Sequence, residues 1–123
     1  MSVSDGGPIE RRALDAIRAL QRPGKPDLLG RVVGLFESEA PASVASLQEA
    51  LASADLTTVR DTAHALKSSS AYVGAMTLSG RCRELEQAAR EGNLPGCVAL
   101  ADALEDDLDA ALAALRELFD RAA

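Results

Sequence analysis

The sequence predicts an all-α protein, an antiparallel four-helix bundle with one or two additional short N-terminal helices. Alanine and leucine dominate the 123 residues, only three residues are aromatic and β-branched residues are sparse, a composition that favours helices over a sheet. Apolar residues recur at the three- and four-residue spacing of a buried helix face. Glycine and proline clusters separate these stretches and suit turns. The length fits one domain with its own core.

The N-terminal part is predicted to contain a flexible lead-in and a short helix. Residues 1–7, rich in serine and glycine, form the lead-in, and residues 8–123 form the bundle domain. Pro8 suits the first turn of the short helix. The apolar residues of that helix are Ile9, Ala13, Leu14, Ile17 and Leu20. The segment R-P-G-K-P-D then ends it.

A second helix follows, and a proline interrupts its pattern. Its first apolar face consists of Leu29, Val32, Val33 and Phe36. Pro41 either kinks this helix or starts a new one. The apolar residues after the proline are Val44, Leu47 and Leu51. The sequence leaves both arrangements open, so the predicted count is five or six helices.

Three further helices complete the predicted bundle. One covers residues 56–73 and ends at Gly74, because glycine adopts a left-handed cap without strain. The next ends at Gly92 and Asn93, and its apolar residues at 4-3-4 spacing are Leu78, Cys82, Leu85 and Ala89. Pro95 opens the last helix. The stripe of that helix consists of Ala101, Leu104, Leu108, Ala111, Leu115 and Leu118.

The composition of the chain limits the classes of partner and the cellular compartment that we expect. With 13 basic and 19 acidic residues, a net charge of −6 and scattered aromatics, the chain is not expected to bind nucleic acid. No stretch approaches the roughly 20 apolar residues of a membrane span, and the N-terminus lacks the apolar core of a signal peptide. Cys82 and Cys97 are expected to be reduced thiols. A cytoplasmic monomer that does not contact a membrane is therefore expected.

His64 is the only histidine, and its place on the helix directs it away from the core. At 100° per residue, the apolar and small residues of this helix centre at roughly 220° from His64. They are Val59, Ala63, Leu66, Ser70 and Val73. The neighbours of His64 on the outer face are Arg60, Asp61, Lys67, Ser68 and Ala71. The pattern predicts an exposed nucleophile with two cations within reach and little bulk in front of it.

Glu86 is the predicted partner of the imidazole. A nucleophilic imidazole needs one nitrogen unprotonated, so an acceptor at the other nitrogen fixes the tautomer. His64 lies about 15 Å before Gly74 along its helix, and Glu86 lies about 18 Å after it along the returning helix, so the two are nearly level. The alternative is a surface carboxylate that pairs with Arg83 or Arg90.

The surrounding residues suit a phosphoryl group rather than ATP. Lys67, one turn beyond His64, is placed to balance phosphoryl charge, with Arg60 on the other side and Arg90 at longer range. The small residues Ser68 and Ala71 leave room for another protein surface. The sequence contains neither a glycine-rich phosphate loop nor a second acidic cluster suited to Mg²⁺. We therefore expect a phosphocarrier rather than an enzyme, with no cofactor bound by the chain itself.

At these residues the chain resembles the histidine-containing phosphotransfer (HPt) domain family. Its signature is roughly H-x-L-K-G-S-[SA]-x-x-[LIV]-G-A followed by L-x-x-x-C-x-x-L-E. The matching residues are His64, Leu66, Lys67, Ser69, Ser70, Val73, Gly74, Ala75, Leu78, Cys82, Leu85 and Glu86. The resemblance extends over about residues 28–91. Ser68 stands where the family usually has glycine, which bears on the rate of transfer or the choice of receiver.

The resemblance implies a four-helix bundle that carries a phosphorylatable histidine. The phosphoryl group would pass from one receiver-domain aspartate through phospho-His64 to another, with Lys67 supporting the charge and Glu86 orienting the ring. Receiver domains and a hybrid histidine kinase are the implied partners, and the receiver would bring Mg²⁺. Two alternatives stay open: the phosphoacceptor module of a chemotaxis-type histidine kinase, and a structural helical adaptor or dimerisation bundle.

Overall fold

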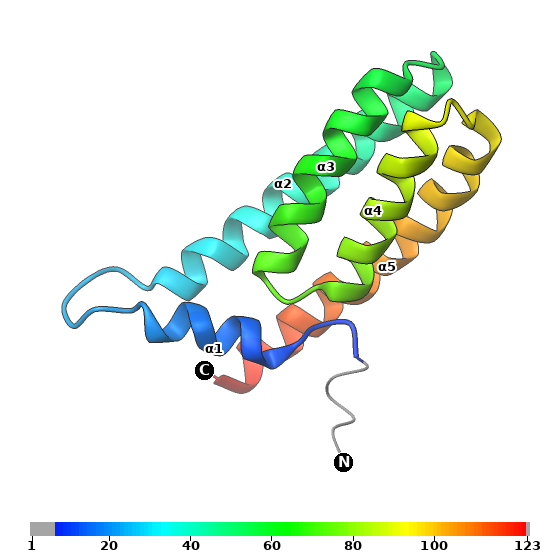
Figure 1. Cartoon of the computed structure of the whole chain (residues 1–123). Coiled ribbons are helices and arrows are strands. Elements are labelled where there is room, and N and C mark those ends of the chain that lie inside the picture. Colours follow the sequence, from blue (N-terminus) through cyan, green and yellow to red (C-terminus); the bar gives the residue numbers. More distant parts are fainter. Residues whose placement is uncertain (1–6, 123) are drawn as a thin grey trace.

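The structure, a computed structural model, describes residues 7–122 and the side chains of residues 7–118. This part of the chain consists of helices α1 (Arg11–Ala19), α2 (Leu28–Ala52), α3 (Leu56–Tyr72), α4 (Met76–Arg90) and α5 (Leu94–Ala122). Helices α2 to α5 lie side by side and alternate in direction (Figure 1). The predicted antiparallel four-helix bundle is confirmed, with one short helix before it.

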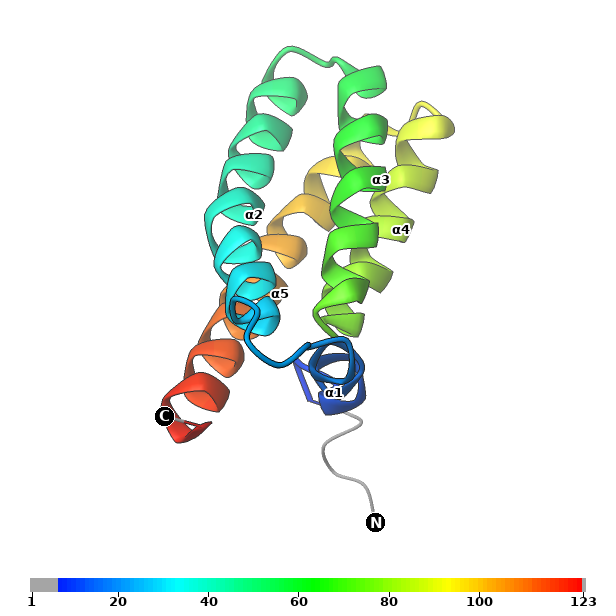
Figure 2. The same ribbon diagram turned by 90° about the vertical axis from the view of Figure 1, so that its left-hand side faces the viewer.

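Helix α1 lies across the end of the bundle that contains the α3–α4 turn (Figure 2). It begins at Arg11, so the prediction that Pro8 occupies its first turn is wrong. Glu10 has an extended backbone, and its N–H donates to the carbonyl oxygen of Gly74 at 2.7 Å. Ile9 is buried although it precedes the helix. The chain is thus anchored against the turn before it becomes helical. Residues 1–6 of the predicted lead-in lie outside the described residues.

Pro41 lies inside a single helix. Helix α2 runs from Leu28 to Ala52 through the proline, which decides between the two arrangements that the sequence left open. The side chain of Asp27 caps its N-terminus by accepting from the N–H of Gly30 at 3.1 Å. The helix buries residues on both sides of Pro41, among them Phe36 and Leu47. Continuity allows one face to cover the full height of the core.

The α3–α4 turn depends on Gly74, as predicted. Its φ of +81° is in the left-handed region, and an added Cβ would collide with the carbonyl oxygen of Glu10. The α3–α4 turn fixes how α4 returns along α3.

The N-terminus of α3 is capped by Asp55. Its carboxylate accepts from the N–H and the hydroxyl of Thr58, which lowers the pKa of Asp55.

The core contains the apolar faces that the sequence predicts. The α3 stripe from Val59 to Val73 is buried, and the α5 stripe is buried as far as Leu115, with Leu118 half-buried. Cys82 and Cys97 are free, buried thiols, and burial raises the pKa of Cys82 to about 12. No helix among the described residues has the length and hydropathy of a membrane span. Because the apolar stripe of α3 packs into the core, the opposite face of α3 is directed outward.

Candidate functional site

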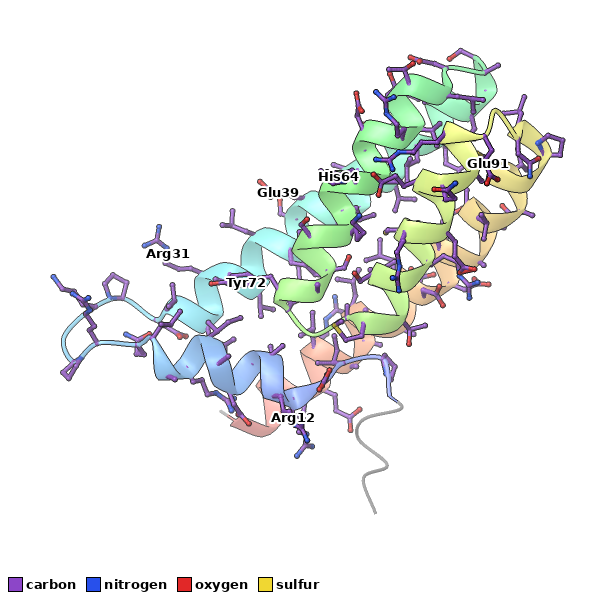
Figure 3. All side chains as sticks on the ribbon, in the orientation of Figure 1. Arg12, Arg31, Glu39, His64, Tyr72 and Glu91 are labelled. Carbon is purple, nitrogen blue, oxygen red and sulfur yellow. The ribbon has the colours of Figure 1, made fainter. Side chains whose placement is uncertain are left out.

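His64 lies half-way along α3 on the face opposite the core (Figure 3). Its side chain is 61% exposed, whereas Ala63 and Leu66 on the inner face are buried. The helical position therefore predicts the orientation correctly. The Nε2 atom has no hydrogen-bond partner among residues 7–118. One ring nitrogen is thus open to an incoming group.

The other ring nitrogen contacts Glu86, as predicted. Nδ1 of His64 lies 2.9 Å from Oε2 of Glu86, which reaches it from α4. The side chain of Glu86 is only 5% exposed. The antiparallel hairpin brings the two residues level because each lies a similar number of turns from Gly74. A neutral ring in this contact donates its Nδ1 proton to the carboxylate.

Glu86 accepts from two cations as well as from the ring. The ammonium of Lys67 lies 2.8 Å from Oε1, and Nη2 of Arg90 lies 2.8 Å from Oε2. The pairing with Arg90, which the sequence offered as an alternative to the contact with His64, occurs together with it. The hydrogen bond from Lys67 chiefly lowers the pKa of Glu86; burial opposes this, and the contact with His64 lowers it further. The carboxylate is therefore ionised at neutral pH.

The remaining predicted residues lie around this cluster without joining it. Arg60 pairs with Asp61, its neighbour on α3, at 3.1 Å and forms neither a hydrogen bond nor an ion pair with Glu86. Ser68 is exposed and Ala71 is half-buried. Both side chains are small, and that they leave room for another protein surface stays a prediction. Arg60 is less closely involved than the sequence suggests, because a nearer carboxylate competes for it.

Ser79 supports the site but was not identified from the sequence. Its buried hydroxyl, on α4, donates to the backbone carbonyl of Lys67 at 2.9 Å and so ties α3 to α4 beside the site. Arg81 in turn donates to Asp107 of α5 at 2.9 Å. A serine next to Leu78 gives little signal in the sequence, because its partner is a backbone atom of another helix.

An apolar groove borders the same face of α3. It lies between α2 and α3 and has a volume of about 300 Å³. The side chains that form its walls include Val32, Leu35, Phe36, Ala65, Ser69 and Tyr72. Leu35 and Tyr72 are both more than half exposed, which is unusual for large apolar side chains on one surface. Its α3 wall includes Ala65, the residue after His64 in the sequence.

Comparison with known proteins gives one consistent result. The family model of the Hpt domain matches residues 31–114. Histidine-containing phosphotransfer protein 2 of Arabidopsis thaliana is 26% identical over 107 residues, which cover 85% of this chain and 69% of that protein. The match to the family model includes most of α2, all of α3 and α4, and more than half of α5.

Solved structures agree with this match. The crystal structure of histidine-containing phosphotransfer protein B from Pseudomonas aeruginosa PAO1 aligns with a TM-score of 0.85 at 27% identity and covers 93% of this chain and 96% of that one. The maize protein ZmHP2 aligns with a TM-score of 0.81 at 23% identity, over 94% and 85% of the two chains, and supports the fold. Because the family model covers more than half of the sequence and includes the His64–Glu86 hairpin, the chain belongs to the Hpt domain family, whose role is histidine phosphotransfer in phosphorelays.

Proposed function

We propose that this chain relays a phosphoryl group between receiver-domain aspartates and that Nε2 of His64 carries it. The observation that supports this proposal best is the unequal state of the two ring nitrogens. Nδ1 contacts a buried carboxylate at 2.9 Å, whereas the ring as a whole is 61% exposed. Since a neutral imidazole has one proton, a proton on Nδ1 leaves the lone pair on Nε2. The exposed nitrogen is then the nucleophile.

The transfer step needs no proton to leave the ring. The lone pair of Nε2 attacks the phosphorus of the receiver's aspartyl phosphate, a P–N bond forms, and the P–O bond breaks with its electron pair returning to the aspartate. Because Nδ1 keeps its proton, the ring gains positive charge, which the carboxylate of Glu86 stabilises through the 2.9 Å contact. Attack by a second receiver aspartate on the same phosphorus reverses the step.

Lys67 is proposed to support the phosphoryl charge. Together, Lys67, Arg90 and Glu86 carry two positive charges and one negative charge, a net charge of +1 beside the neutral ring. Fixed positive charge at the place where an anion arrives stabilises the transition state. The Lys67 ammonium is held by Oε1 of Glu86 and is 28% exposed, so it stays near the ring yet accessible. Arg60, which is paired with Asp61, adds only a long-range field.

We propose that the partner domain docks over the outer face of α3 and the α2–α3 groove. Ser68 and Ala71 leave space above the imidazole, and the exposed Leu35 and Tyr72 offer apolar contact area beside it. The receiver would hold Mg²⁺ and most of the catalytic groups, while this chain acts as the carrier. In this proposal the chain works as a cytoplasmic monomer, and a hybrid histidine kinase supplies the phosphoryl group.

Transfer from a labelled receiver tests the assignment of His64. A receiver domain phosphorylated with labelled acetyl phosphate should pass its label to the chain, and His64→Gln should abolish acceptance. The label should be acid-labile and base-stable, as a P–N bond requires. Lys67→Ala should slow transfer about tenfold with unchanged circular dichroism, whereas Arg83→Ala, on the exposed side of α4, should transfer normally.

Other outcomes would point to the alternatives. An acid-stable label, or undiminished labelling of the His64→Gln variant, would contradict the role of His64. Labelling by an isolated chemotaxis-type kinase with ATP, without transfer from any receiver in a panel, would instead favour a kinase phosphoacceptor module. The absence of labelling from every donor would favour a structural adaptor.

A further inference from the structure

Arg90 and His64 contact the same oxygen atom of Glu86. Nη2 of Arg90 lies 2.8 Å from Oε2, and Nδ1 of His64 lies 2.9 Å from it. Arg90 is 55% exposed and lies one turn after Glu86 on α4. An exposed pair at this spacing contributes little to helix stability. Because both groups contact this oxygen, the guanidinium is connected electrostatically to the ring through Glu86.

The other charged groups near the ring are already paired or lie on its other sides. On α3, Arg60 and Asp61 pair with each other, and Lys67 binds the second oxygen of Glu86. On α2, Glu39 lines a shallow hollow together with Asp61 and Ala65. On α4, Glu86 and Arg90 face the ring. Arg90 is thus the cation on α4 that contacts Oε2 of Glu86, the carboxylate oxygen beside Nδ1.

We propose that Arg90 is a positioning residue of the phosphoacceptor site, which acts through Glu86 to keep the His64 ring neutral. The positive guanidinium offsets part of the negative charge of Oε2. The carboxylate then still orients the Nδ1 proton, but it stabilises a second proton on Nε2 less. A protonated Nε2 has no lone pair and cannot accept a phosphoryl group. Arg90 therefore extends phosphoryl acceptance toward mildly acidic pH. The consequence for transfer rests on the proposed function; the effect on the ring does not.

NMR titration of the unphosphorylated chain tests this proposal. His64 is the only histidine, so its ring signals in a ¹⁵N-histidine-labelled sample need no further assignment. In Arg90→Ala, the midpoint of ring protonation should rise by about half a pH unit, the order expected when one nearby unit charge is removed at a solvent-exposed site. Arg90→Lys should restore most of the original midpoint. Arg83→Ala removes an equal charge one turn before Glu86 and should leave the midpoint within a tenth of a unit of the parent.

A double-mutant cycle tests whether the effect passes through Glu86. In a Glu86→Gln background, Arg90→Ala should change the midpoint by less than half as much as in the parent. An unchanged midpoint in Arg90→Ala with native circular dichroism would show an ordinary helix-surface pair and overturn the proposal. An equal shift in both backgrounds would also overturn it, because Arg90 would then act on the ring directly.

Phosphorylation with potassium phosphoramidate gives the functional readout. Relative to the parent, the loss of acceptance rate in Arg90→Ala should be about threefold greater at pH 6 than at pH 8, the counterpart of the half-unit shift. An equal loss at both values would contradict a role in ring protonation. If His64→Gln were still labelled, the proposed function would fail, while the titration would continue to decide the role of Arg90.

Discussion

Glu86 is a buried residue that contacts the ring of the exposed His64. A buried carboxylate is costly unless charged or polar partners surround it, and here Lys67, Arg90 and His64 supply three contacts of 2.8–2.9 Å. Those contacts hold the side chain in one position, so its second oxygen meets Nδ1 of the ring. The electrostatic balance at this residue connects the stability of the α3–α4 hairpin with the tautomer of His64.

The balance at Glu86 predicts a pH-dependent contribution to stability. The hydrogen bond from Lys67 is the main cause of its lowered pKa, so the folded pKa lies below the usual value of 4.5. The contribution is then fully present above about pH 4.5 and is lost as the pH falls through the lowered folded pKa. Parent and Glu86→Gln should differ in urea unfolding at pH 7 by about 1–2 kcal/mol.

The same comparison in acid completes this prediction. The difference in the free energy of unfolding should shrink as the pH falls from 4.5 through the lowered folded pKa of Glu86. Because other carboxylates titrate in both proteins, the difference between them isolates Glu86. A difference that stayed constant from pH 7 to pH 3 would show that the ionised carboxylate does not contribute.

At the scale of elements, the α3–α4 turn joins the site to the N-terminal helix. Gly74 ends α3, and its carbonyl accepts from the N–H of Glu10 just before α1. This turn joins α3, which contains His64, to α4, which contains Glu86, so its geometry sets the register of the site. The docking of α1 against the turn stabilises that geometry.

Gly74→Ala should therefore destabilise the protein, while a second glycine provides the control. An alanine at Gly74 has an unfavourable left-handed φ and a collision with the backbone of Glu10, so we expect a loss of about 2 kcal/mol or more. Gly80, inside α4, has no atom within 4 Å of an added Cβ. Gly80→Ala should stabilise by about 0.5–1 kcal/mol. Urea unfolding measures both, and equal effects of the two substitutions would contradict this account of the turn.

Helical periodicity predicts the elements well, and its failures have local causes. A periodicity of 3.6 residues per turn, together with one glycine turn, predicts that His64 points outward and lies level with Glu86. Pro8 fits a helix start by composition, yet the buried Ile9 and the contact between Glu10 and Gly74 hold that segment extended. Such tertiary anchors join residues far apart in the sequence, so local patterns do not reveal them.

The partners of long side chains were harder to predict than their faces. Arg60 and Lys67 both lie on the outer side of α3 as the sequence indicates, but Arg60 binds Asp61 whereas Lys67 reaches Glu86 on the next helix. Several carboxylates lie within reach of each cation, and the choice depends on backbone positions that periodicity does not fix. Ser79 was missed for a related reason, because it binds a backbone carbonyl of another helix.

At the scale of the whole molecule, α3 contributes one face to the core of the bundle and carries His64 on the opposite face. The apolar stripes of α2 to α5 fill a common core, and the hydrophilic side of α3 is left uncovered (Figures 1 and 2). The ring is exposed on α3, and its buried partner comes from α4, so in the proposed function a partner domain reaches His64 without disturbing the core. This division fits a carrier that must present one nitrogen to successive partners.

In the proposed function, the phosphoryl group binds Nε2 of His64 while Nδ1 keeps its contact with Glu86. NMR of a ¹⁵N-histidine-labelled chain, phosphorylated by a receiver domain, measures this directly. We expect a single phosphohistidine with phosphorus coupled to Nε2 and a proton retained on Nδ1. Phosphorus coupled to Nδ1, or a phosphorylated chain whose His64 signals are unchanged, would contradict it.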